Sequence, residues 1–256
     1  MEVGTSFKRQ LYPSMENAIA WLQALVFLVG LVFFNWNPVF VVFAYFFETI
    51  IVGIIHTLKL LMVIIFSKTP ATGTGILTSN INQKATPGIG VVFFFLIHYF
   101  LFVFVQSIFV FSFFGDTDKN FKDGFYVIHN YIYLLRMPEM QLAVLCITMA
   151  NIGYTIKNFV IPGNYKTAAV NKMFMQPYGR IIVQQFVAVA SGFFFIISGS
   201  GFFAAILLII ARLISDLVLI AIQNNSHFKE KVILYLSKKG SNPQNARMLI
   251  GNFFDK

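Results

Sequence analysis

The sequence predicts an all-α integral membrane protein with six transmembrane helices, an outer interfacial helix and a basic cytoplasmic tail. Of its 256 residues, 57% are hydrophobic and 11% are charged, about half the charged share of an ordinary soluble domain. The mean hydropathy is +0.74, and several apolar runs reach the ~20 residues that a helix needs to cross the hydrocarbon. This composition excludes a soluble globular enzyme. The single cysteine, Cys146, also excludes an intramolecular disulfide and a thiolate metal cluster.

Six apolar runs define the expected spans, which lie at about 17–34, 39–66, 90–114, 140–160, 181–197 and 202–222. The first ends at Asn35-Trp36-Asn37-Pro38, which joins a turn signal to an interfacial tryptophan. This run has no small-x-small site before that break, so we interpret it as an uncleaved span. The second run exceeds the bilayer requirement and must tilt or protrude. We expect a six-helix domain over 1–223, followed by a tail over 224–256.

Basic residues predict the orientation of these spans, because cytoplasmic loops carry an excess of Lys and Arg. Only Lys119, Lys122 and Arg136 fall on the predicted outer face. The inner face carries all the others that we assign: Lys8, Arg9, Lys59, Lys68, Lys84, Lys157, Lys166, Lys172, Arg180, Lys229, Lys231, Lys238, Lys239, Arg247 and Lys256. Both termini are therefore expected in the cytoplasm of a bacterium, with the chain in its cytoplasmic (inner) membrane. The net charge of +9 then reflects topology and anionic lipid contact, and no nucleic acid partner is expected.

Two segments outside the spans are expected to lie on the membrane surface. In the outer loop, Phe121, Phe125, Ile128, Ile132 and Leu135 recur at helical spacing, which predicts a short interfacial helix within 120–136. The tail over 224–256 alternates basic and apolar residues. We interpret it as a cationic amphipathic segment on the membrane surface, with docking to a partner as the alternative.

Ionisable residues inside the spans are the candidate functional residues, because each costs several kcal/mol unless it faces a partner or a cavity. Glu48 and Arg212 fall at similar depths near the midplane, so an ion pair between them is permitted. Asp216 lies one turn from Arg212 on the same helix face and would complete a cluster of three charges. The alternative is that this cluster only fixes helix packing and register.

A second polar layer is expected nearer the cytoplasm. Tyr45, Glu48, His56 and Lys59 fall within an arc of about 80° on the second span. The third span adds His98 and Gln106, and further spans add Asn151, Gln184, Gln185 and Gln223. These stripes predict one shared polar interior, which is either a closed hydrogen-bond network or a wetted pathway.

The spacing of these residues gives little support for a metal site, a haem site or a catalytic serine. Glu48, His56, His98 and Asp216 are acceptable metal ligands, and the histidines could bind haem, but no His-x-x-His or Glu-x-x-His pair exists. A lone histidine on an apolar helix is more often a hydrogen-bonded packing residue, so no cofactor is expected. The later spans supply no histidine to activate Ser191 or its neighbours. At the cytoplasmic face, Lys166, Lys172 and Arg180 are candidate contacts for an anion or a lipid headgroup.

Three stretches together resemble the uncharacterised prokaryotic membrane family known as domain of unknown function 6498. They are Trp36-x-Pro38 followed by Tyr45-x-x-Glu48, His98-Tyr99 in a Phe-rich span ending in Phe113-Phe114-Gly115, and Pro177-Tyr178-Gly179-Arg180 followed by Arg212-x-x-x-Asp216. The family pattern commonly has a second histidine where this chain has Gln106, which weakens a two-histidine ligand site. The resemblance implies no reaction.

Three classes of function follow. The first is a non-enzymatic membrane subunit or scaffold, or a pathway for ions or small solutes; the lack of paired broken helices favours the subunit. Its partners would be membrane lipids and another membrane protein or a second copy. The second is an intramembrane metal- or haem-binding redox protein or enzyme. Headgroup processing at the basic cytoplasmic loop is a third alternative.

Overall fold

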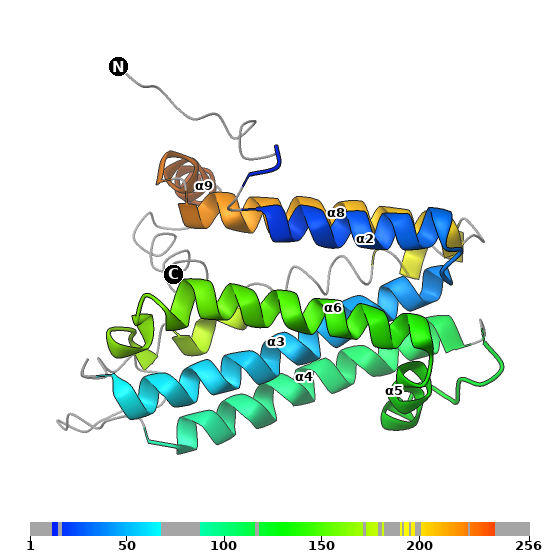
Figure 1. The fold of residues 1–256 in the computed structure, drawn as a ribbon, viewed down its shortest axis with the longest axis horizontal. Helices are drawn as coiled ribbons and strands as arrows, with labels where there is room; N and C mark the ends of the chain where they lie inside the picture. The colour runs from blue at the N-terminus through cyan, green and yellow to red at the C-terminus, as the bar shows by residue number, and fades with distance from the viewer. Residues whose placement is uncertain are drawn as a thin grey trace. The chain divides into compact units, whose positions relative to one another are not determined.

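The computed structural model is mainly helical. The residues it describes are 12–14, 17–67, 88–115, 118–170, 173–178, 181, 190, 192–194, 196–197, 201–224 and 226–238. No strand occurs among these residues. The longer helices in chain order are α2 Ala18–Phe33, α3 Pro38–Phe66, α4 Gly90–Phe114, α5 Val127–Leu135, α6 Pro138–Thr155, α8 Gly201–Asn224 and α9 Ser226–Lys238 (Figure 1). A π-helix, η2 Ile156–Val160, and a 3-10 helix, η3 Asn164–Lys166, follow α6.

Four helices within the described residues are long and apolar enough to cross a membrane: Pro38–Phe66, Gly90–Phe114, Pro138–Val160 and Gly201–Ile222. They confirm that the second, third, fourth and sixth predicted runs form helices of bilayer-spanning length. The first run forms α2, whose 16 residues extend only ~24 Å at 1.5 Å per residue. The fifth run, at 181–197, lies largely outside the described residues. A count of six spans therefore remains a prediction.

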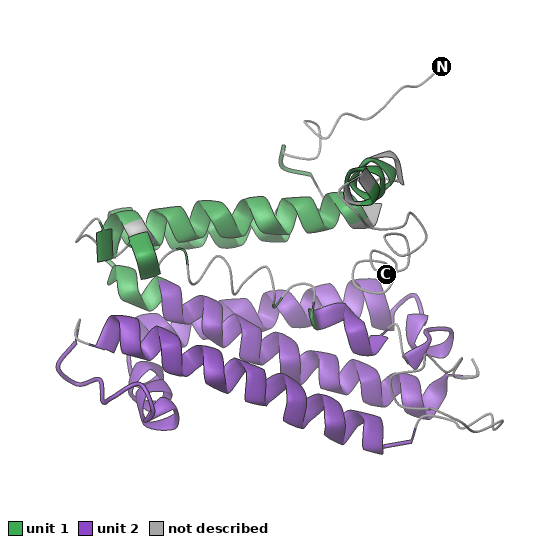
Figure 2. Cartoon of the chain, turned by 180° about the vertical axis from the view of Figure 1, so that it is seen from behind, with its two compact units in different colours: residues 1–41, 178–256 green, residues 42–177 purple. Residues whose placement is uncertain are grey.

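The chain forms two compact units, which Figure 2 distinguishes by colour. Unit 1 comprises Met1–Val41 and Tyr178–Lys256, and unit 2 comprises Val42–Pro177. The boundary falls within α3, so the first turn of this helix belongs to unit 1 and the rest to unit 2.

Unit 1 is built on the packing of α2 along α8 (Figure 1). The buried side chains of α2 include Ala20, Ala24, Phe27 and Leu31, which recur every three or four residues and so share one helix face. Small residues such as the two alanines let helix backbones approach closely in a membrane. α9 contacts the end of α8, where Ile233 and Ile222 form a small buried cluster. The first part of the predicted tail is therefore helical; its place on the membrane surface stays a prediction, and 239–256 lie outside the described residues.

A tight turn separates α2 from α3, as the sequence predicted. The carbonyl of Gly30 accepts hydrogen bonds from the backbone N–H groups of Phe34 and Trp36, at 3.2 and 3.0 Å. Asn35 adopts a left-handed φ of 51°, which asparagine tolerates better than most residues. The Trp36 ring lies directly over Gly30, where a Cβ atom would clash with it. Glycine at position 30 is therefore required for this turn to close.

Unit 2 has an aromatic core at the end where α3 begins and α4 ends. Phe43 of α3 stacks on Phe111 of α4 with ring centroids 4.5 Å apart. Phe121, from the segment after α4, contacts both rings at 5.5 and 5.7 Å. Tyr131 of α5 packs edge-on against Phe111 at 5.1 Å and against Phe47 at 5.0 Å. These rings join α3, α4, α5 and the connecting segment into one packed layer.

The helix predicted within 120–136 is shorter than the sequence indicated. It begins at Val127, so Phe121 and Phe125 precede it and the prediction of a helix around them was wrong. Aspartate side chains accept the backbone donors that a helix would have used: the N–H of Phe125 donates to Asp123 at 3.0 Å. Asn130, fully buried, accepts from the N–H of Lys122 at 2.9 Å and donates back to its carbonyl at 3.0 Å. These side chains stabilise a turn in place of a helical turn.

The fourth span ends in an unusual geometry. The N–H of Ile161 bonds to the carbonyl of Ile156 at 2.9 Å, a π-helical spacing. Gly163 then adopts a left-handed φ of 73°, which glycine reaches without strain. The chain turns back there, and Tyr165 of η3 packs against Phe159 of η2 with centroids 6.3 Å apart. π-helical turns are rare and often lie at functional sites.

Candidate functional site

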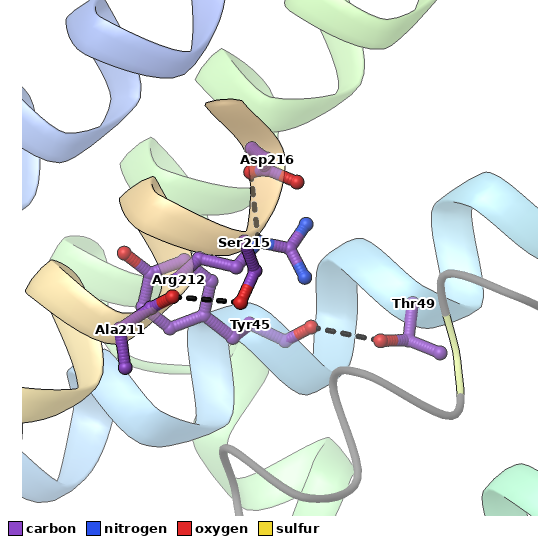
Figure 3. Close-up of polar contacts among 6 residues, drawn as sticks. All are labelled: Tyr45, Thr49, Ala211, Arg212, Ser215 and Asp216. Atoms are coloured by element: carbon purple, nitrogen blue, oxygen red, sulfur yellow. Dashed lines mark hydrogen bonds and ion pairs between the residues drawn. The ribbon is translucent and has the colours of Figure 1, made fainter. Parts of the chain in front are cut away.

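The polar stripe predicted on α3 is buried over most of its length. Tyr45 is 7% exposed, Glu48 is fully buried and His56 is 6% exposed. Lys59, the last member of the stripe, is half-buried. Thr49, one position after Glu48, is buried as well, and its hydroxyl donates to the carbonyl of Tyr45 at 3.1 Å (Figure 3).

His56 makes a long-range polar contact within unit 2. Its Nε2 atom lies 2.6 Å from the carbonyl oxygen of Met173, 117 residues away in the chain. A carbonyl oxygen only accepts, so Nε2 must carry the proton and donate it. Met173 is helical, as are residues 174–178, and its own N–H donates to the carbonyl of Ala169 at 3.0 Å. In a helix its carbonyl would in turn accept from the N–H of residue 177. That residue is Pro177, which has no N–H, so His56 supplies the donor that the backbone lacks.

His98 does not share this environment. Its side chain is exposed, and its ring stacks on Phe94 with centroids 5.6 Å apart. The next residue, Tyr99, takes the buried position on α4, because adjacent helix residues point about 100° apart. Among the residues that the structure describes, no group of three His, Cys, Asp or Glu side chains forms a metal site.

Tyr99 ties α4 to α3. Its hydroxyl donates to the carbonyl of Thr49 at 2.9 Å. Its ring lies over Gly53 so closely that a Cβ atom at that position would clash with it. A buried tyrosine hydroxyl needs such a partner, and the glycine provides the room that the ring needs. The sequence showed Gly53 only as an isolated glycine without this role.

Gln106 and Ser107 lie buried further along α4. The hydroxyl of Ser107 donates to the carbonyl of Val103 at 2.7 Å. Its single proton is then used, so Tyr131 donates to Ser107 across their 2.8 Å contact. The Nε2 atom of Gln106 is buried without a hydrogen-bond partner among the described residues.

Between α4 and α5, Asp118 anchors the connecting segment to α5. It accepts hydrogen bonds from the Tyr133 hydroxyl at 2.7 Å and from the backbone N–H of Asn120 at 2.9 Å. Burial opposes ionisation of Asp118, but these bonds and one from the Asn120 amide outweigh it and lower the pKa of the carboxyl. Burial and the bond to Asp118 raise the pKa of Tyr133. Nothing in the local sequence marks Asp118, because Tyr133 becomes its neighbour only in the fold.

In unit 1, Arg212 and Asp216 form the ion pair that their spacing predicted. The Arg212 Nε atom donates to Asp216 Oδ2 at 3.0 Å, with the two side chains 5% and 14% exposed (Figure 3). One turn of α8 separates them. Glu48 belongs to unit 2, so its pairing with Arg212 stays a prediction.

Of the three side chains predicted to contact an anion or a lipid headgroup, the structure describes only Lys166. Lys166 is exposed, with its ammonium nitrogen 5.7 Å from the Tyr165 ring centroid. Lys172 and Arg180 lie outside the described residues, as do Gln184 and Gln185.

Comparison with known proteins adds one finding. A family model matches residues 6–232, and its description is a family of unknown function (DUF6498). The chain belongs to this family. Membership in DUF6498 confirms the resemblance carried by the tryptophan–proline break and the arginine–aspartate helix, and it assigns no activity. No curated protein and no solved structure matches the chain.

Proposed function

We propose that this chain is a non-enzymatic, multi-pass subunit or scaffold of the bacterial cytoplasmic membrane. The contact of His56 with the Met173 carbonyl is the observation that carries the proposal. The Nε2 atom of His56 donates a hydrogen bond to the backbone carbonyl of Met173. Pro177 has no N–H with which to make this bond. A histidine used in this way holds the fold together.

The other polar contacts of the described spans support the same interpretation. Three of them join helices or turns to one another: Tyr99 with Thr49, Ser107 with Tyr131, and Ser67 with the carbonyl of Ala168 at 3.0 Å. Polar side chains in membrane helix bundles commonly form interhelical hydrogen bonds of this kind. A bundle that uses its polar groups for cohesion suits a protein that presents a fixed surface to a partner.

Six spans with both termini in the cytoplasm complete the proposal, supported by the concentration of lysine and arginine on one predicted face. The test uses the single native cysteine. In a Cys146→Ser background, a cysteine replacing Lys122 should react with a membrane-impermeant thiol reagent added to intact cells, and one replacing Lys229 should not. Labelling of both positions from outside, or of Lys229 alone, would overturn the topology.

The subunit role is tested by the mass of the assembly extracted in a mild detergent. We expect the 29.0 kDa chain to leave the membrane in a complex of fixed stoichiometry, either with a second copy or with another membrane protein. A monomer, obtained from the native membrane at native expression level without prior exposure to harsh detergent, would contradict the proposal.

A pathway for ions or small solutes is the second candidate, and Gln106 is the observation that favours it. Its buried amide Nε2 has no hydrogen-bond partner within the described part of the chain, as expected of a group that faces bound water. An intramembrane metal or haem protein is the third candidate. It predicts stoichiometric metal or a haem absorption band in the detergent-purified protein, lost in His98→Ala or His56→Ala.

A further inference from the structure

Helix α9 packs against α8 at the depth where the apolar part of α8 ends. Ile233 of α9 and Ile222 of α8 form a buried cluster, and two partly buried valines pack against it, Val218 and Val232. The apolar stretch of α8 that is long enough to cross a membrane is Gly201–Ile222. Val218 lies four residues before its end, which is ~6 Å along the helix at 1.5 Å per residue. The contact with α9 therefore falls in about the last turn of this stretch.

The direction of α9 differs from that of α8. The first helix ends at Asn224 and the second begins at Ser226. Figure 1 shows α8 running across the view and α9 nearly end-on, and Figure 2 shows the same arrangement from behind. A helix that crosses the end of a membrane-spanning helix lies along the membrane plane, at the boundary between acyl chains and headgroups. This is the position of an interfacial amphipathic helix.

The side of α9 that points away from α8 carries two exposed apolar side chains and a lysine. Leu234 is 55% exposed and Tyr235 is 66% exposed, and Lys231 is exposed as well. At about 100° per residue these three side chains fall within an arc of about 100°, on the side of the helix opposite Ile233. We call Lys231, Leu234 and Tyr235 the exposed face of α9.

The charge of α9 is complementary to an anionic lipid surface. The helix contains three lysines and one glutamate, a net charge of +2. Residues 239–256 add three basic residues and one acidic residue to the sequence. Lys231 forms no ion pair within the described part of the chain, so its ammonium group can reach a phosphate. Lysine at a membrane boundary extends its charge to the headgroups while its stem stays on apolar surface, and tyrosine is enriched at the same depth.

We infer that α9 lies in the plane of the membrane with its exposed face against anionic phospholipid. Leu234 and Tyr235 contact the acyl chains near the headgroups, and Lys231 pairs with a lipid phosphate. The packing of Ile233 on Ile222 fixes this orientation, because the opposite side of α9 then points outward along the membrane, where lipid surrounds the chain. The inference rests on the proposed embedding of α8 in the bilayer and is independent of the subunit role.

The test is quenching of a fluorophore by brominated lipid, with the full chain in vesicles of equal amounts of phosphatidylglycerol and phosphatidylcholine. A bimane group is attached to Leu234→Cys in a Cys146→Ser background. Position 234 is exposed, so the label leaves the buried cluster with α8 intact. The acyl chains of phosphatidylglycerol carry the bromines in one sample, and those of phosphatidylcholine carry them in the other. The ratio of the two quenching constants measures which lipid lies against the exposed face.

We expect phosphatidylglycerol to quench the label in preference to phosphatidylcholine. One basic residue near a membrane surface contributes about fivefold to anionic lipid affinity, so Lys231→Gln should weaken this preference about fivefold. Lys231→Arg keeps the charge and should retain the preference. Equal quenching by both lipids in the wild-type background, or a preference that Lys231→Gln leaves unchanged, would overturn the inference.

A label at Ile210→Cys is the matched control, because Ile210 is 49% exposed in the middle of α8. Lipid brominated deep in its acyl chains should quench it, and Lys231→Gln should not alter that quenching. Quenching at position 210 with none at position 234 would overturn the inference and leave the embedding of α8 intact. Iodide in the buffer would then quench position 234 if water covers the exposed face, and would not if another protein covers it. No quenching at position 210 would overturn the embedding and the inference together.

Discussion

Replacing His56 with leucine should destabilise the protein, because the Met173 carbonyl would lose its hydrogen-bond donor and Pro177 has no N–H to replace it. Leucine keeps most of the side-chain bulk against Phe95, whose ring lies 5.4 Å from that of His56. It leaves the carbonyl of Met173 without the hydrogen bond that His56 now provides at 2.6 Å. An unsatisfied buried carbonyl costs about 1–3 kcal/mol, and single side-chain hydrogen bonds in membrane bundles reach about 1.7 kcal/mol. We expect His56→Leu to lower the free energy of unfolding by about 1–2 kcal/mol.

The decisive variant is Pro177→Ala, which restores a backbone N–H four residues after Met173. In that background the Met173 carbonyl has a helical donor of its own, so His56→Leu should cost less. We expect a coupling free energy of about 1 kcal/mol in a double-mutant cycle, measured by denaturant unfolding of the full chain in mixed micelles. The matched control is His98→Leu, a histidine that is exposed on α4, and its effect should add to that of Pro177→Ala within about 0.5 kcal/mol. If the His56 cycle were equally additive, the account of this histidine would be wrong.

Three further predictions concern unit 2. Gly53→Ala places a Cβ atom against the ring of Tyr99 and should lower the free energy of unfolding by about 1–3 kcal/mol; unchanged stability in the same unfolding assay would contradict the contact. Tyr131→Phe removes the hydroxyl that donates to Ser107 at 2.8 Å and should lower the free energy of unfolding by about 0.5–1.5 kcal/mol. Ser107→Ala should then destabilise the Tyr131→Phe variant less than it destabilises the wild-type chain. The lowered pKa of Asp118 stabilises the fold above pH ~4, and this contribution is lost as the pH falls through the folded-state pKa. The protection factors of the α5 amides, which are corrected for the pH dependence of intrinsic exchange, should therefore fall in acid, and Asp118→Asn should abolish that fall; an unchanged acid response in the variant would count against it.

The sequence predicted most of the helices because long apolar runs and turn signals are local features. The third run, 90–114, coincides with α4 Gly90–Phe114, and Asn37 caps α3 by accepting from the N–H of Val39 at 2.9 Å. The pair of Arg212 and Asp216 was predictable for the same reason, since residues four apart share a helix face.

The contacts that join distant segments of unit 2 were not predictable from spacing. His56 and Met173 are 117 residues apart, and nothing in the local sequence shows that they meet. One signal was present: Pro177 within a helical turn leaves a carbonyl that needs a donor from elsewhere. The exposure of His98 was missed because α4 is apolar on every face, so the pattern could not show which side is buried. The outer segment was mistaken for helix because its phenylalanines have helical spacing, while the competing aspartate turns decide the backbone.

Ion flux through proteoliposomes is the most direct test of the central claim that the polar side chains of the spans hold the protein together. The measurement compares the wild-type chain, Glu48→Gln and Arg212→Gln, each at equal incorporation and with unfolding curves recorded in parallel. The account predicts flux no greater than that of empty vesicles for all three, with lower stability in the variants. A flux carried by the wild-type chain and abolished in both variants while their stability is unchanged would contradict it and establish a pathway.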